Sequence, residues 1–233
     1  MNSSIRKITL LAAGMLLSAN ICLRAQSDQT PPTPEVEEAA TQIDVEALIK
    51  GATYMTAEER EVVRELNYAR TKPQEYAQKV LTPFLKRFRP DGSYMENNVR
   101  NLTKEGAAAV KEAIDALMAT EPLPALIPEE KLYKAAAYHT KDTGPKGLVQ
   151  HESSDGTTSH DRIKRFFETR TTGECMAFAN NKARPIVIQM LVDDGVKSRG
   201  HRLNIMSPDY KYVGVYIGTH TSWKWLCTMD FAQ

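Results

Sequence analysis

The order of hydrophobic patterns along the chain most limits how this sequence can fold. Apolar residues recur at helical spacing from residue 56 to about residue 143, and four helices are predicted there. Convincing β-rich runs appear only later, at residues 173–179, 212–217 and 225–231. Because the helices come first and do not alternate with strands, we expect an α+β layered domain rather than a doubly wound parallel sheet.

Capping signals predict where several helices begin. Thr56 and Glu59 form a Thr-x-x-Glu capping box, and Pro73 suits the first turn of a second helix. Thr158 and Asp161 predict the start of a short helix that follows a turn-rich loop. These signals divide the chain into short elements joined by polar turns.

The N-terminus has the sequence of an export signal. Arg6 and Lys7 precede an uncharged stretch over residues 8–23, and Ala25 provides the small residue expected before a cleavage point. The stretch falls short of the roughly 20 strongly apolar residues that a membrane span needs, and no second candidate span follows. We therefore expect residues 1–25 to be a cleaved signal peptide and the mature protein to be secreted or periplasmic.

Cys22 leaves one alternative at this end, a lipid-modified N-terminus. Ile21 occupies the position where a small residue would be expected, so a plain signal peptide is preferred. Residues 26–55 contain a proline- and glutamate-rich segment and are expected to form a disordered linker. The folded domain is then expected over residues 56–233.

Charge and cysteine content limit the function further. The chain has 30 basic and 29 acidic residues, and the net charge of +1 provides no field for gathering nucleic acid or an anionic membrane surface. Cys22 leaves with the signal. In an oxidising compartment, Cys175 and Cys227 can then form a disulfide or remain two buried thiols.

The residues that could carry chemistry are spread along the chain. Phosphate-loop, dinucleotide, His-Glu-x-x-His and Gly-x-Ser-x-Gly motifs are all missing from the sequence. Taken alone, each candidate has an ordinary explanation as a solvated loop residue or a rim charge. Together they would combine imidazole and carboxylate groups in one site. The candidates are His151, Glu174, Asp193, Asp194 and His201.

A longer series of residues resembles a known family. The series runs in order through Asn67, Tyr68, Ala69, Arg70, Pro73, Tyr76, Leu132, Ala136, His151, Asp155, Gly156, Arg162, Gly173, Glu174, Gly200, His201, Arg202, Asn204, Ile205, Val213, Gly214, Asp230 and Phe231. It is similar to the bacterial branch of the CAP superfamily, which joins cysteine-rich secretory proteins, antigen 5 and pathogenesis-related proteins. The Gly-His-Arg-x-Asn-Ile stretch after Gly-Glu is its most specific part.

The resemblance implies a three-layer α/β/α sandwich, with an antiparallel sheet between helices and one cleft lined by two histidines and two acids. It carries His151, Glu174 and His201 onto matching positions. Many relatives place a glutamate before the second histidine, where this chain has Asp193, with Asp194 as the other candidate. His151 and His201 are the implied ligands of a divalent metal, for which zinc is the first choice.

Cys175 departs from the family pattern. The family usually has asparagine after Gly-Glu, so the side-chain amide that would order this loop is missing here. A disulfide between Cys175 and Cys227 is our hypothesis for what orders it instead.

Three functions fit these residues. The first is a module that binds a small molecule, a lipid or another envelope ligand, since relatives bind sterols and fatty acids. The second is a structural envelope interaction protein in which the four residues form a hydrogen-bonded network. The third is a metal-dependent hydrolase in which Glu174 is the general base or accepts a hydrogen bond that fixes the tautomer of a histidine ligand. A metal-free hydrolase that uses Ser153 is a weaker variant. Whether the chain is an enzyme stays open.

The other histidines and the tryptophans have structural interpretations. His139 is expected in the core, and His160 and His220 are expected on the surface. Trp223 and Trp225 are two positions apart, which predicts one shared strand face. That face would be either covered by the core or open as a platform that stacks sugars.

Overall fold

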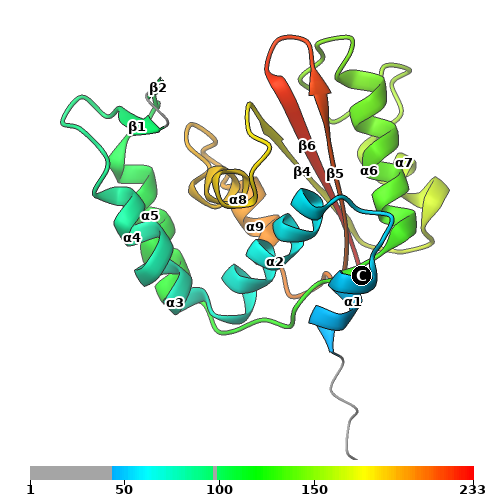
Figure 1. The fold of residues 1–233 in the computed structure, drawn as a ribbon, viewed down its shortest axis with the longest axis horizontal. Helices are drawn as coiled ribbons and strands as arrows, with labels where there is room; N and C mark the ends of the chain where they lie inside the picture. The colour runs from blue at the N-terminus through cyan, green and yellow to red at the C-terminus, as the bar shows by residue number, and fades with distance from the viewer. Residues whose placement is uncertain (1–43, 97–98) are drawn as a thin grey trace, which may run out of the picture. The chain divides into compact units, whose positions relative to one another are not determined.

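The computed structural model describes residues 44–96 and 99–233 (Figure 1). The expected signal peptide, the alternative lipid anchor at Cys22 and residues 26–43 of the expected linker lie outside the described residues. Within the described residues the strands form a two-stranded sheet, β1-β2, and a four-stranded sheet in the order β3-β5-β6-β4. The strand bounds are β1 Tyr94–Glu96, β2 Val99–Asn101, β3 Ile127–Pro128, β4 Thr172–Phe178, β5 Tyr212–His220 and β6 Lys224–Ala232.

The four-stranded sheet is built on the C-terminal hairpin that the sequence predicts. β6 pairs antiparallel with both β5 and β4, and only the short β3 runs parallel to β5. The register places Glu174 opposite Asp230, and Asp230 opposite Gly214. The strand pairing therefore fixes the position of Glu174, one of the acids of the candidate site.

Helices cover both faces of this sheet (Figure 1). α6 and α7 lie on one side, whereas α2, α8 and α9 lie on the other. α3, the π-helical turn η1 and α4 follow one another in one continuous helical run, which packs beside α5, and α5 also contacts α8. The helix bounds are α1 Val45–Gly51, α2 Ala57–Thr71, α3 Pro73–Tyr76, η1 Ala77–Leu81, α4 Thr82–Leu85, α5 Ala107–Met118, α6 Glu130–Thr143, α7 Ser159–Phe166, α8 Ala183–Val192 and α9 Gly200–Ile205. The expected α+β sandwich is confirmed.

The capping box at the start of α2 also joins that helix to the sheet. The Glu59 amide donates to Thr56 Oγ1 at 3.2 Å, and the Thr56 amide donates to Glu59 Oε2 at 2.7 Å. The other Glu59 oxygen accepts from the amide of Ile217 on β5 at 2.8 Å. Burial of this carboxylate is thus offset by hydrogen bonds from two elements.

The folded part begins earlier than residue 56. α1 lies inside the segment expected to be a linker, and Ile49, Ala52 and Met55 are buried in the core. Asp44 caps this helix by accepting from the Ala47 amide at 3.0 Å. The linker prediction is wrong for residues 44–55, because tertiary burial of a few apolar side chains outweighs a charged local composition.

The hypothesis of a disulfide is wrong for this structure. Cys175 and Cys227 are both free and buried, on the adjacent strands β4 and β6. Cys175 pairs with Met229 and Cys227 pairs with Ala177, so the two cysteines are diagonal neighbours. Such neighbours lie roughly 7–8 Å apart, beyond the usual Cα separation of about 4.4–6.8 Å for a disulfide.

Asn204 places a side-chain amide beside Cys175. Its Nδ2 donates to the Glu174 carbonyl at 3.1 Å and lies 3.9 Å from Cys175 Sγ. A hydrogen bond from α9, and not a disulfide, therefore joins this part of β4 to its neighbour.

Gly214 allows β5 to approach α6 at backbone distance. A Cβ there would lie 2.1 Å from Leu132 C and from Tyr133 N. We expect Gly214→Ala to lower the free energy of unfolding by about 1–3 kcal/mol or more, because backbone atoms must move. Gly51→Ala is the matched control, since nothing lies within 4 Å of its added carbon. Urea unfolding of both variants tests this; equal stabilities would contradict the close approach.

Candidate functional site

His201 is held by Asp193 at the end of α8. The His201 side chain donates from Nδ1 to Asp193 Oδ1 at 2.6 Å, and its backbone amide donates to Asp193 Oδ2 at 3.0 Å. Asp193 is buried and adopts the left-handed conformation, with φ of 56°, which aspartate tolerates better than most residues. Because the carboxylate is the acceptor, the hydrogen lies on Nδ1 and the lone pair of a neutral His201 lies on Nε2.

His151 has the same arrangement with a different acid. Its Nδ1 donates to Glu174 Oε1 at 2.7 Å, and Glu174 is buried on β4. This hydrogen bond raises the pKa of His151, although partial burial opposes the shift. The His151 side chain is 48% exposed, so it can contact a ligand while its hydrogen bond to buried Glu174 fixes its tautomer.

Arg162 of α7 lies fully buried beneath His151. Its Nη2 donates to Glu174 Oε2, and its Nη1 donates to the His151 carbonyl at 3.0 Å and to Ser153 Oγ at 3.3 Å. One guanidinium therefore positions both the acid and the backbone of the histidine. Ser153 is buried against Arg162, which argues against the weaker variant in which it would serve as the nucleophile of a metal-free hydrolase.

Asp230 adds a second buried acid beside Glu174. Both of its oxygens lack a hydrogen-bond partner among the described residues. Burial, together with the neighbouring Glu174, raises the pKa of Asp230 well above its ordinary value. For Glu174, burial acts in the same direction, but the hydrogen bond from His151 and the charge of Arg162 prevail and lower its pKa. The pKa values of these two neighbouring acids are therefore shifted in opposite directions.

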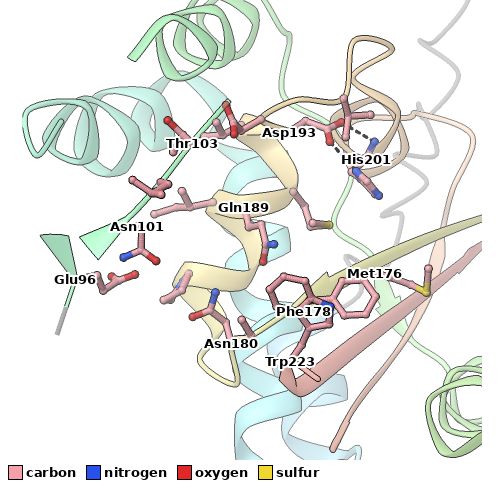
Figure 2. A pocket seen from close by; sticks show the side chains of 18 of the residues that line it. Glu96, Asn101, Thr103, Met176, Phe178, Asn180, Gln189, Asp193, His201 and Trp223 are labelled. Atoms are coloured by element: carbon pink, nitrogen blue, oxygen red, sulfur yellow. Dashed lines mark hydrogen bonds and ion pairs between the residues drawn. The ribbon is translucent and has the colours of Figure 1, made fainter. Parts of the chain in front are cut away.

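The two histidines meet at one cavity. Their ring centroids are 6.5 Å apart, and within residues 44–96 and 99–233 neither Nε2 atom makes a hydrogen bond. His151, Asp193 and His201 line a cavity of about 560 Å³, and Figure 2 shows Asp193 and His201 at one end of it. The structure thus brings together the four residues singled out in the sequence.

Asp194 has a different task from Asp193. Its carboxylate accepts from the amides of Lys104 and Glu105 at 2.7 and 2.8 Å, just before α5. Of the two candidate acids, only Asp193 bonds to His201. The choice between them depends on the backbone at the end of α8, which the sequence does not reveal.

The walls of the cavity mix apolar, aromatic and amide side chains. Phe178 and Trp223 lie near one another, and the side chains of Asn101, Asn180 and Gln189 also face the space (Figure 2). The described part of the lining includes no lysine or arginine, and its ionisable groups, apart from Tyr94, are three acids and two histidines: Glu96, Asp193, Asp194, His151 and His201.

Two predictions about the C-terminal hairpin are wrong. The sequence predicts that His220 is exposed, but it is buried, and its Nδ1 accepts hydrogen bonds from the amides of Ser222 and Trp223. Trp223 belongs to the turn, and Lys224 has a φ of 68°, which interrupts the alternation of side chains before Trp225. The two tryptophans therefore do not share a strand face.

The other two histidine predictions are confirmed. His139 is fully buried, where its Nε2 donates to the Gln150 carbonyl at 3.1 Å. His160 is exposed at the start of α7. Neither residue lines the cavity.

Asp142 of α6 fastens the loop that carries His151. It accepts from the Ser154 amide and hydroxyl, each at 2.7 Å, and from Lys146 Nζ at 2.5 Å. Burial opposes ionisation, but these hydrogen bonds outweigh it and lower the pKa of Asp142 to about 2. Ionised Asp142 therefore holds the loop in place at neutral pH.

This contact predicts a dependence of the loop on acid. A lowered folded pKa contributes stability above the unfolded value of about 3.9, and that stability is lost as pH falls through the folded value of about 2. We expect Asp142→Asn to reduce this acid dependence and to speed amide exchange in residues 151–157. Hydrogen exchange and urea unfolding across this pH range measure both effects. Asp115→Asn, on an exposed part of α5, is the control; identical profiles for the two variants would contradict the assignment.

This chain belongs to the CAP family, described as the cysteine-rich secretory protein family, whose sequence pattern matches residues 63–231. It is also similar to solved bacterial structures. An extracellular protein containing an SCP domain from Bacillus anthracis str. Ames is 20% identical, with a TM-score of 0.41, over 55% of this chain and 38% of that one. An outer surface protein from Borrelia burgdorferi is 21% identical, with a TM-score of 0.41, over 48% of this chain and 79% of that one.

A third similar structure is a cysteine-rich secretory protein from Staphylococcus aureus subsp. aureus Mu50. It is 14% identical, with a TM-score of 0.36, over 60% of this chain and 42% of that one. The present chain thus spans less than half the length of the Bacillus and Staphylococcus structures. None of the curated proteins matches this chain. In the described part of the chain, no helix has both the length and the apolar character that a membrane crossing requires.

Proposed function

We propose that this chain is an exported CAP-domain module that binds a small molecule or another component of the cell envelope in the cavity beside His151 and His201. The observation that carries the proposal is the cavity itself. Its volume of about 560 Å³ is typical of small-molecule sites. Apolar walls with a few polar groups are the usual lining of such sites. Export rests on the sequence of residues 1–25 and on membership of a secretory family.

The charges around the cavity restrict the ligand. Among the described residues, three acids and no lysine or arginine line it. Glu96 is paired with Arg87 beside the lining, but the carboxylates of Asp193 and Asp194 form no ion pair with a described lysine or arginine, so a ligand carboxylate or phosphate near the histidines would meet like charge. A neutral ligand avoids this cost. The free Nε2 atoms of His151 and His201 can accept hydrogen bonds from its hydroxyl or amide groups. Neutral lipids remain compatible with this lining, and fatty acids fit it less well.

A blocking substitution tests this proposal. Gln189 is exposed on α8 and lines the cavity, so Gln189→Trp should fill the space without disturbing the core. We expect organic extraction and mass spectrometry to detect a bound molecule in the unmodified protein and to lose it in this variant. Leu203→Trp, at a position that is 65% exposed on α9 and outside the cavity, is the matched control. Equal ligand yield in both variants, or an empty extract of the unmodified protein, would contradict binding in this cavity.

A metal site is the second candidate, and the two fixed histidine tautomers favour it. Neutral imidazole nitrogens with carboxylates on the opposite ring atom are typical zinc ligands, so the residues fit the group. The described residues contain no group of three or more histidine, cysteine or acidic side chains arranged around one ion. His151 and His201 would therefore hold the ion together with water or ligand atoms. When bound, zinc would supply acidification of a water molecule, which is the chemistry that a hydrolase needs.

The two neighbouring aspartates give a matched test of this site. We expect Asp193→Asn to weaken zinc binding by about 10–100-fold, because His201 loses its carboxylate partner. Asp194→Asn should leave the affinity unchanged, since Asp194 bonds to the start of α5. Calorimetric zinc titration measures both, with His151→Ala plus His201→Ala as the reference without the histidines. Zinc retained by that double variant would exclude the histidine site. A lower melting temperature in it, without any metal or ligand, would favour the structural network.

A further inference from the structure

We propose that the end of the cavity at Trp223 is a saccharide subsite that takes a neutral, N-acetylated sugar ring. The inference rests on the proposed function, because it names the ligand class of the same cavity. Two observations carry it: an aromatic pair at the rim whose tryptophan is exposed, and the Asn180 and Gln189 side-chain amides, which make no hydrogen bond to described residues and face the same space.

The aromatic pair consists of Phe178 and Trp223. Trp223 is 49% exposed. The centroids of the Trp223 and Phe178 rings lie 6.4 Å apart, and the angle between the two ring planes is 57°. Buried His220 holds both residues. It packs edge-on against Phe178 at 5.4 Å and accepts a hydrogen bond from the Trp223 amide at 3.1 Å. The turn therefore holds the backbone of Trp223 and presents its indole to solvent, as a sugar-stacking residue requires.

Amide side chains supply the polar part of the subsite. Among the described residues, neither the Asn180 nor the Gln189 side chain makes a hydrogen bond, and Asn101 bonds only to the nearby Val99 carbonyl. Each amide offers two donors and one acceptor. These groups complement hydroxyls and, above all, an acetamido group, which has one donor and one acceptor. Figure 2 shows Asn101, Asn180 and Gln189 facing the same space as Phe178 and Trp223.

The remaining lining agrees with a sugar better than with an acyl chain. A fatty acid or phospholipid would bring an anion to a cavity whose described lining has acids and no lysine or arginine. A neutral sugar has one apolar ring face for the indole and hydroxyl edges for the amides. Met176 and Ile188, which also line the cavity, provide apolar contacts for the acetamido methyl group.

A single-tryptophan protein provides the first test. The chain has two tryptophans, so Trp225→Phe leaves Trp223 as the only one. We expect its fluorescence to change saturably with a β-1,4-linked tetramer of N-acetylglucosamine. The β-1,4-linked tetramer of glucose, which lacks the acetamido groups, should bind at least tenfold more weakly. Calorimetry on the unmodified protein checks that the Trp225 substitution does not alter the affinity.

Variants at the subsite then separate stacking from polar recognition. Trp223→Ala should weaken binding of the N-acetylated tetramer at least tenfold, and Trp223→Tyr should keep it within about threefold, since a ring remains to stack. Asn180→Ala with Gln189→Ala should remove the preference over the glucose tetramer. Leu203→Ala, exposed and outside the cavity, should bind normally. Melting temperatures show that each variant is folded.

The outcomes distinguish this inference from the proposed function. Absence of binding by both tetramers, with another molecule found in the cavity by extraction, would overturn the saccharide subsite and leave the binding function standing. Unchanged binding in Trp223→Ala would also overturn it, because the sugar would lie elsewhere. Equal affinity for the two tetramers would overturn the acetamido assignment. If the extract is empty and neither tetramer binds, both the saccharide subsite and the proposed ligand binding in this cavity are contradicted.

Discussion

The buried ion pair between Arg162 and Glu174 is the interaction on which the site depends. Taking both charges out of water is costly, and the cost is offset only when further hydrogen bonds satisfy the remaining atoms. Here the same guanidinium also donates to the His151 carbonyl and to Ser153, while Glu174 accepts from His151; of the Arg162 nitrogens, Nε alone has no partner among the described residues. The position of the histidine loop is thus a direct consequence of satisfying two buried charges.

Asp193 reaches an equivalent result by a different route. It has no arginine partner for its carboxylate in the described structure; that group accepts from both the side chain and the backbone amide of His201. The left-handed turn at the end of α8 brings this short side chain directly against the imidazole. The backbone conformation at the end of α8 therefore determines that the carboxylate of Asp193, and not that of Asp194, bonds to His201.

The parts of the fold that could be predicted are those with local signals. The Thr56 capping box and the C-terminal hairpin are visible in the sequence, and the family pattern brings His151, Glu174 and His201 together. Strand register is not visible, so the diagonal placement of Cys175 and Cys227 could not be anticipated. The same limit hides Asp230, whose raised pKa results from its burial beside Glu174.

The lining of the cavity is harder to predict from the sequence because its residues come from segments that are far apart in the chain. Phe88 of the helical half, Phe178 at the end of β4 and Trp223 of the final turn meet only in the folded chain. The sequence allows Trp223 to be a stacking residue but predicts the wrong setting for it, since the positive φ of Lys224 separates it from the strand. Such a feature depends on backbone conformation and not on the spacing of tryptophans.

The charge distribution makes the two ends of the cavity chemically independent. Acids and histidines are the main ionisable groups of its lining, so a bound cation near His151 and His201 would be favoured by Asp193, which bonds to His201, whether or not a neutral ligand lies beside Trp223. An anionic ligand would differ, because it would need that cation, or a protonated histidine, before it could enter. A neutral ring requires neither. A metal ion at the histidines and a neutral sugar at Trp223, as proposed, would therefore not depend on one another for charge compensation.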